Sequence, residues 1–149
     1  MARLLKSSFG AAGTMVNLDG NVGAKGGNER SDVGAVQFAL LLLSSGTETP
    51  NGPRGGGLDV PGQTRIAVDG IFGPQTAAFI AAYQARRARA PGPGASPLPA
   101  PDGNFGSFRR TEWSFVLLQG DVEDQMGSFL ERVRFDPRCP TFVKESFLA

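Results

Sequence analysis

The sequence has no histidine and a single cysteine, Cys139. The absence of histidine removes the commonest general base, together with the Ser-His and Cys-His pairs of nucleophilic enzymes. A single cysteine cannot form an internal disulfide, and without histidine there is no His/Cys set for zinc or iron. Carboxylate pairs can act without histidine, but no Asp/Glu pair stands in a recognisable catalytic motif. We therefore expect a protein that is not an enzyme and that holds no metal or other cofactor.

Neither sign of charge dominates, and long apolar runs are missing. With 15 basic and 14 acidic residues, the chain has no overall field that would attract nucleic acid or an anionic membrane. No segment approaches the roughly 20 apolar residues of a membrane-spanning helix, and the N-terminus has no apolar stretch of signal-peptide length. We expect no nucleic-acid partner and no membrane insertion, and we expect a protein made in the cytoplasm without a signal peptide.

Glycine and proline are abundant. The 21 glycines and 11 prolines exceed a fifth of the 149 residues, which predicts long loops and few helices. Residues 91–101 contain five prolines and are interpreted as a semi-rigid linker. Residues 6–30 are rich in Gly, Ser and Asn and predict a loop or extended arm with room for one short strand. Residues 23–28 lack the Gly-Lys-Ser/Thr ending of a phosphate loop and are interpreted as a lead-in to the first helix.

The first predicted helix has its N-cap at Ser31 or Asp32. Apolar side chains then repeat at helical spacing from Val33 to about Ser44. Residues 38–43 are apolar on nearly every side, so we expect this helix either at the centre of a small bundle or with one face against a partner. The next residues, 46–62, predict a long loop.

The second predicted helix begins at Pro74. Gly70 and Gly73 suit a tight loop before it, and proline tolerates the first helical turn because no N–H is needed there. The helix is expected to run to about Arg87. Its basic end, residues 86–89, either complements the helix dipole, which we favour, or attracts an anionic polymer.

Two motifs of this region resemble a known family. Residues 69–76, DGIFGPQT, with Tyr83 and Gln84 after them, resemble the signature of the peptidoglycan-binding domains found beside bacterial cell-wall hydrolases. Upstream, residues 32–41, DVGAVQFALL, resemble that family's first core helix, in which Val-x-x-Val-Gln-x-x-Leu-Leu recurs. The resemblance covers residues 23–85 and is specific because several features match together and in the family's order.

The resemblance implies a mainly α fold, a small three-helix peptidoglycan-binding-like bundle with long Gly/Pro-rich loops and a C-terminal helical extension. The implied domain organisation is an N-terminal arm (1–22), a peptidoglycan-binding-like domain (23–90), a Pro-rich linker (91–101) and the extension (102–149), which packs on the same core or stands apart from it.

It also implies a non-catalytic module that binds peptidoglycan or muropeptides and anchors a partner or assembly at the bacterial wall. Candidate ligand-binding residues are Gln37, Arg65, Asp69, Gln75 and Tyr83. The motif residues with a structural role are Asp69, Gly70, Phe72, Gly73, Pro74, Thr76 and Gln84. Most motif positions are explained by turn chemistry, a core plug and helix initiation, so the motif identifies the fold better than the ligand site.

Two other functions remain open. A structural or adaptor subunit of a phage tail, or of a contractile or other secretion apparatus, would use the same fold for protein contacts through the N-terminal arm and the apolar C-terminal tail. A wall hydrolase using carboxylates in residues 102–149 is a third hypothesis, although no positioned acid-base set is visible. The protein would act at the cell wall or periplasm, or in a phage or secretion particle.

The C-terminal segment contains an echo of the motif. Residues 102–106, DGNFG, resemble residues 69–73, DGIFG, and Thr111 precedes Gln119 by the eight residues that separate Thr76 from Gln84. This is a degenerate second motif, the closing turn of the family's domain, or a coincidence of common turn residues. Residues 113–118 predict a third helix or a buried strand. Residues 122–133 predict a fourth helix ended by Asp136 and Pro137, and the apolar tail, 140–149, is expected to dock on the core or on another chain.

Overall fold

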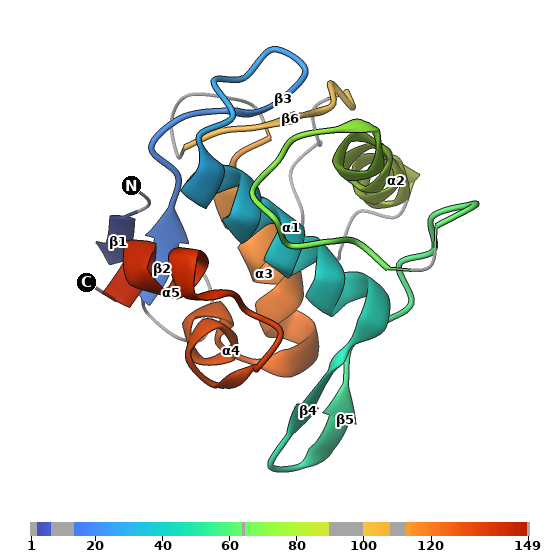
Figure 1. Cartoon of the computed structure of the whole chain (residues 1–149). Coiled ribbons are helices and arrows are strands. Elements are labelled where there is room, and N and C mark those ends of the chain that lie inside the picture. Colours follow the sequence, from blue (N-terminus) through green and yellow to red (C-terminus); the bar gives the residue numbers. More distant parts are fainter. Residues whose placement is uncertain (1–2, 7–13, 64, 90–99, 108–112, 149) are drawn as a thin grey trace.

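The computed structural model describes residues 3–6, 14–63, 65–89, 100–107 and 113–148 (Figure 1). In this part of the chain, helices dominate and the sheets are small, so the prediction of a mainly α protein is confirmed. The helices are α1 (Arg30–Ser45), α2 (Pro74–Arg89), α3 (Phe115–Met126), α4 (Phe129–Phe135) and α5 (Thr141–Leu148). The antiparallel strand pairs are β1 (Arg3–Lys6) with β2 (Thr14–Asn17), β3 (Val22–Gly23) with β6 (Asn104–Phe105), and β4 (Thr47–Thr49) with β5 (Gly52–Arg54). None of the helices in the described ranges is long and apolar enough to cross a bilayer.

Helix α1 lies at the centre of the molecule, as its all-round apolar pattern predicts (Figure 1). It contacts α2, α3 and α5, and every residue from Val33 to Leu43 is buried. At Gly34 the side chains of α5 pack so closely that an added Cβ would lie 2.6 Å from atoms of Phe142 and Val143. A residue without a side chain is therefore needed where these two helices cross.

The predicted N-cap of α1 is wrong by a few residues. The helix begins at Arg30 after Glu29, so Asp32 lies within its first turn. The Asp32 carboxylate instead accepts hydrogen bonds from the backbone N–H groups of Asp19 (3.2 Å) and Gly20 (2.9 Å). It fixes the chain that leads into the helix and is fully buried in doing so.

The predicted fourth helix is divided between two helices. Residues 115–126 form one helix, α3, so the open choice between helix and strand for residues 113–118 is resolved in favour of a helix beginning at Phe115. Gly127 then has φ of 84° and ends α3, because a residue in this region cannot continue the helical hydrogen-bond ladder. Ser128 caps α4 by accepting the N–H of Glu131 (3.3 Å), and α4 ends before Asp136 and Pro137, as predicted.

Both ends of the described chain contribute to one core. In α5, Val143 and Phe147 are buried, so the apolar tail docks on its own chain. Of the segment expected as an N-terminal arm, Met15, Val16, Leu18 and Val22 are buried in the core, and Val16 is fully buried. Its N–H donates to Oε1 of Gln119 (2.8 Å), and Nε2 of Gln119 donates to its carbonyl (2.6 Å).

The C-terminal extension shares this core, in which Trp113, Phe115 and Phe129 pack with α1 residues. The predicted linker, 91–101, lies outside the described residues except for its last two.

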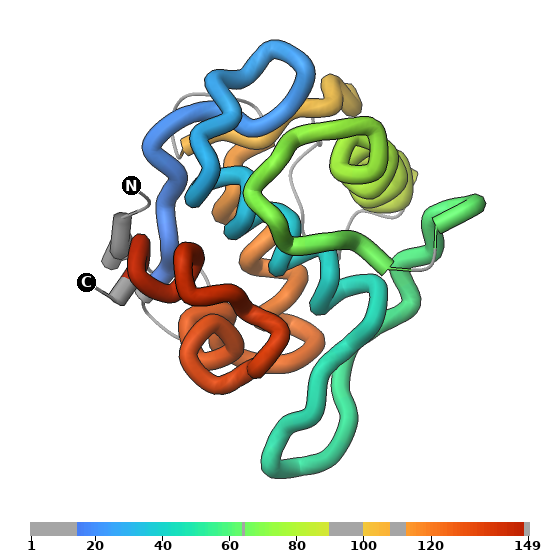
Figure 2. Tube along the Cα trace, viewed as in Figure 1, coloured from blue at the N-terminus to red at the C-terminus, as the bar shows by residue number. Residues whose placement is uncertain are grey.

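The long loop after α1 is partly ordered as a hairpin. Strands β4 and β5 pair from Thr47 with Arg54 to Thr49 with Gly52, within the segment predicted as loop. Figure 2 shows this hairpin projecting from the body, and shows the segment before α2 passing across α1. These two segments and the connection between α4 and α5 lie around two clefts.

Candidate functional site

The motif turn is held on α1 by the side-chain amide of Gln37. Its Nε2 donates to Oδ1 of Asp69 (3.0 Å), to the carbonyl of Ile71 (3.0 Å) and to Oγ1 of Thr76 (2.9 Å). Its Oε1 accepts the N–H groups of Asp69 (3.0 Å) and Gly70 (2.9 Å). Gln37 is 1% exposed, and these bonds use both of its lone pairs and both of its amide protons. Its role is to shape the turn, and it has nothing left to offer a ligand.

The echo forms a second turn of the same construction, held by Gln84 of α2. Nε2 of Gln84 donates to Oδ1 of Asp102 (3.3 Å) and to the carbonyl of Asn104 (3.0 Å), and Oε1 accepts the N–H of Gly103 (2.8 Å). Gly103 has φ of 75°, the same value as Gly70. In each turn the aspartate also accepts the N–H of the residue two positions on. This shared construction favours a repeated turn over a coincidence of common residues.

Tyr83 lies in a small pocket on a different part of the molecule. Its side chain is 4% exposed, and its hydroxyl donates to the carboxylate of Asp121. Burial and the neighbouring Asp121 charge raise the pKa of Tyr83 well above its ordinary value. The pocket has about 170 Å³ and is also lined by Arg86 and Arg87, of which Arg87 lies 3.5 Å from Asp121. The basic end of α2 is thus partly paired with α3.

Two of the five sequence candidates, Arg65 and Gln75, share a cleft of about 380 Å³. Gln75 organises the wall: its Oε1 accepts the N–H of Ala67 (3.0 Å), and its Nε2 donates to the carbonyl of Arg65 (3.1 Å) and to Oε1 of Gln63 (3.1 Å). Arg65 is exposed. The remaining lining is an apolar floor and one more cation: Leu41, Ile66, Ala67, Val68 and Arg138. Asp69, also exposed, is not among the residues that line it.

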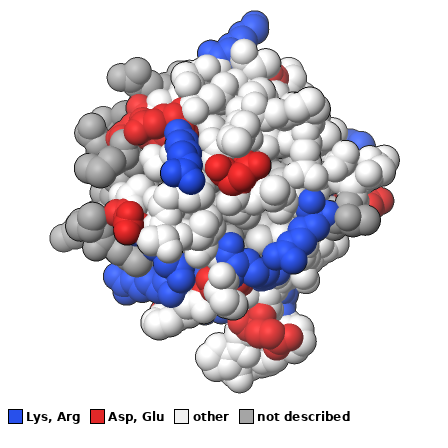
Figure 3. Space-filling model, viewed as in Figure 1, with Lys and Arg blue, Asp and Glu red and all other residues white. Residues whose placement is uncertain are grey.

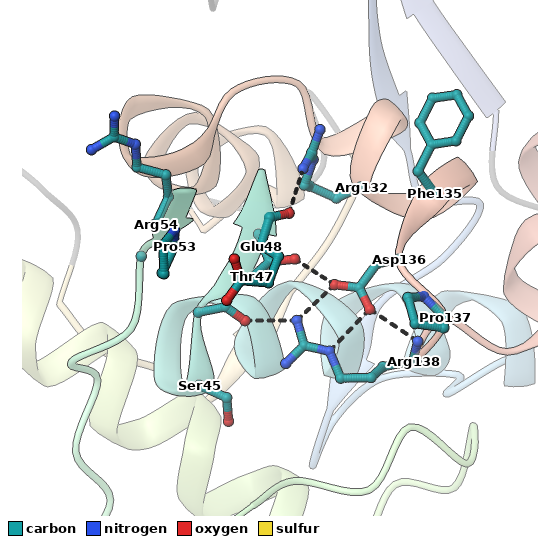
Figure 4. Close-up of a pocket in the computed structure, with 12 residues that line it drawn as sticks. Ser45, Thr47, Glu48, Pro53, Arg54, Arg132, Phe135, Asp136, Pro137 and Arg138 are labelled. Atoms are coloured by element: carbon teal, nitrogen blue, oxygen red, sulfur yellow. Dashed lines mark hydrogen bonds and ion pairs between the residues drawn. The ribbon is translucent and has the colours of Figure 1, made fainter. Parts of the chain in front are cut away.

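Arg138 belongs to the site but was not predicted from the sequence. It lies in a segment without a motif, and only the fold brings it beside Arg65. It also lines a second, larger cleft of about 470 Å³ between the β4–β5 hairpin and the connection from α4 to α5 (Figure 4). The residues that line that cleft are Ser45, Gly46, Thr47, Glu48, Pro53, Arg54, Gly55, Arg132, Phe135, Asp136, Pro137 and Arg138.

An ion pair between Asp136 and Arg138 braces the larger cleft (Figure 4). Nε and Nη2 of Arg138 donate to the two carboxylate oxygens at 2.9 and 2.6 Å, and the hydroxyl of Thr47 donates to Oδ2 at 2.6 Å. Nη2 also donates to the carbonyl of Gly46 (2.6 Å). Burial alone would raise the pKa of Asp136, but the hydrogen bonds from Arg138 and Thr47 lower it to about 2. The brace therefore joins the start of the hairpin to the C-terminal segment at all but very acid pH.

Basic and aromatic groups lie around the rim of this cleft. Arg132 is 8% exposed and donates from Nη1 to the carbonyl of Glu48 (3.3 Å). Phe135, by contrast, is 75% exposed; together with Ile71 it is one of two large apolar side chains exposed in the described part of the chain. Figure 3 shows a band of Lys and Arg side chains across this face of the molecule, above the projecting hairpin, with acidic side chains beside it.

Comparison of the chain with protein-family models, with curated proteins and with solved structures gives no match. Among the residues described, no group of three or more His, Cys, Asp or Glu side chains is placed to hold a metal ion. The repeated turn and the chemistry of the two clefts are therefore the features of the molecule that bear on its function.

Proposed function

We propose that this protein is a non-catalytic peptidoglycan-binding module that holds a partner or an assembly at the bacterial cell wall. The observation that supports this most is the repeated turn, with Gln37 bound to Asp69 and Gly70, and Gln84 bound to Asp102 and Gly103. These are residues of the motifs that resemble peptidoglycan-binding domains. Their hydrogen bonds give a physical reason for finding glutamine and Asp-Gly at this spacing. In this proposal the three-helix bundle consists of α1 and α2, from the expected domain 23–90, and α3, from the expected extension 102–149.

The cleft beside the motif turn suits the chemistry of the proposed ligand. Peptidoglycan presents sugar rings, N-acetyl groups and lactyl carbonyls, with peptides that carry carboxylates. Binding it requires an apolar floor with a few cationic and polar groups at the rim. Ile66 and Leu41 supply such a floor, and Arg65 and Arg138 line the same cleft. The guanidinium group of Arg65 matches a carboxylate well because several of its N–H donors lie in one plane, whereas that of Arg138 is already paired with Asp136.

The larger cleft does not have the features of a glycosidase site. Its carboxylates are Glu48 and Asp136. A general acid must be protonated at working pH, but Asp136 has a pKa of about 2 and is saturated by donors. Glu48, the other carboxylate of the cleft, is exposed at the surface. This arrangement favours binding over cleavage.

The adaptor hypothesis has less support from the described residues. It relied on the glycine-rich N-terminal arm, on an apolar face of α1 and on the apolar tail. Of these, the apolar face of α1 and the apolar side chains Val143 and Phe147 of the tail are buried in the chain's own core. Wall binding is for that reason the function that we put forward.

The test is co-sedimentation of the purified full chain with insoluble peptidoglycan. We expect saturable depletion from the supernatant, well above that of a neutral protein of similar size. Depletion equal to that of the control protein would refute wall binding. Release of soluble muropeptides during incubation would instead indicate an enzyme.

A further inference from the structure

We infer that the two clefts on either side of Arg138 form one bipartite ligand site, in which Phe135 supports a sugar ring and Arg65 binds a carboxylate of the attached peptide. The inference rests on the proposed function and goes beyond it by assigning each cleft a part of the polymer. It also gives residues 132–138, in the C-terminal segment, a role in binding.

The clefts are joined by a residue that belongs to both. Arg138 lines the cleft of about 380 Å³ and the cleft of about 470 Å³, and each volume lies within the range of roughly 300–1,000 Å³ that is typical of ligand sites. The guanidinium group is held in place, since Nε and Nη2 are bonded to Asp136 and to the carbonyl of Gly46. The guanidinium group of Arg138 is therefore a fixed polar group between the two clefts, and an extended ligand can cross it from one cleft to the other.

The charges around Arg138 assign different ligand groups to the two arginines. Asp136 neutralises Arg138, whose remaining nitrogen, Nη1, points away from Asp136 and has no hydrogen bond drawn to it in Figure 4. A neutralised guanidinium favours a neutral acceptor such as an amide carbonyl. Arg65 is exposed, and no ion pair joins it to an acidic side chain of the described segments. In the smaller cleft it is therefore the arginine whose charge is available for a carboxylate.

Phe135 is the aromatic residue that lines the larger cleft, beside Pro53 and Pro137. At 75% exposure its ring contributes little to the core, although the flanking segment is braced through Asp136. An exposed aromatic ring at the mouth of a cleft is a feature of binding surfaces. The C–H face of a sugar ring is flat and apolar and can pack on it, which leaves the hydroxyl and N-acetyl groups for the polar groups around Arg138. The glycan and its peptide thus match the order of Phe135, Arg138 and Arg65.

The test is titration calorimetry of the full chain with a disaccharide-tripeptide muropeptide that has free carboxylates. Phe135→Ala and Arg65→Ala remove exposed side chains, so their melting temperatures should match that of the unchanged protein. Each should weaken muropeptide binding about tenfold. The matched controls are Ile71→Ala, the other large apolar residue exposed in the described segments, and Arg89→Ala, an exposed arginine outside both clefts; both should bind as the unchanged protein does.

Two further ligands assign each half of the site. A muropeptide with amidated carboxylates should bind the unchanged protein about tenfold more weakly, and Arg65→Ala should no longer distinguish the two forms. The disaccharide without its peptide should respond to Phe135→Ala but not to Arg65→Ala. If the unchanged protein sediments with peptidoglycan while Phe135→Ala and Arg65→Ala bind the muropeptide normally, the bipartite site is refuted and wall binding stands. If the unchanged protein does not sediment with peptidoglycan, both proposals fail.

Discussion

Replacing Gln37 by methionine tests whether one buried amide holds the motif turn on α1. Methionine is an unbranched side chain of similar length, so it fills the same space but makes none of the five hydrogen bonds of the amide. We expect the motif turn to loosen while α1 and the core around it stay folded. Affinity for peptidoglycan would then decrease only to the extent that the loosened turn changes the shape of the cleft beside it.

The size of the effect depends on which groups lose their partner. The bonds to Thr76 and Gly70 are buried, and leaving a buried polar group unpaired costs about 1–3 kcal/mol. The bonds to Asp69 and Ile71 are partly exposed, so water replaces the amide and the loss is nearer 0.5 kcal/mol each. Burial of the methionine returns about 1 kcal/mol. The expected decrease in the free energy of unfolding is about 2.5–6.5 kcal/mol, or roughly 5–26 °C in melting temperature for a chain of this size.

Urea unfolding monitored by circular dichroism measures this change, provided that the transition is two-state. The control is Gln125→Met on α3, because Gln125 is partly exposed and makes no side-chain hydrogen bond to the described residues. Its free energy of unfolding should change by less than about 0.5 kcal/mol. A Gln37→Met protein as stable as this control would show that the turn does not depend on the amide.

Two further predictions concern the repeated turn and the buried carboxylate. Gly70 and Gly103 both have φ of 75°, but an added Cβ lies 2.4 Å from Arg30 Cγ at Gly70 and meets nothing within 4 Å at Gly103. Gly103→Ala should therefore cost about 1–2 kcal/mol of unfolding free energy through backbone strain alone, and Gly70→Ala distinctly more; equal losses in urea unfolding would contradict this. Burial raises the pKa of Asp32 from 3.8 to about 6, so the folded protein holds this proton more tightly than the unfolded chain does. The contribution of Asp32 to the free energy of unfolding is therefore fully present below pH 4 and is lost as the pH rises through 6. The loss amounts to up to about 3 kcal/mol. The test is to measure the unfolding free energies of Asp32→Asn and of the unchanged protein at pH 4 and pH 7. Between these pH values the stability of Asp32→Asn relative to the unchanged protein should rise by about this amount. A difference that does not change with pH would refute the raised pKa of Asp32.

Local signals predict the two helices beside the motif. Pro74 begins α2 as expected, because proline fixes φ near the helical value and Gly70 can adopt the positive φ that the preceding turn needs, whatever packs around them. Helix α1 is predicted by apolar residues at helical spacing. The break at Gly127 was missed because Met126, Phe129 and Val133 keep that spacing across it, although α4 turns away from α3. Glycine-rich composition likewise predicted an arm where Met15 and Val16 are buried in the core.

The sequence by itself determined the turns and the helices of the motif region, since glycine, proline and periodic apolar residues act over a few positions. Only the tertiary structure decided which side chains are available to a ligand. Gln37 and Tyr83 are polar candidates whose hydrogen bonds are taken by Asp69 and Asp121 once the chain folds. Arg138 reaches the cleft of Arg65 because α5 packs on α1 and brings a distant segment with it. Pairing between residues far apart in the chain depends on the packing of whole helices, so a local sequence pattern does not predict it.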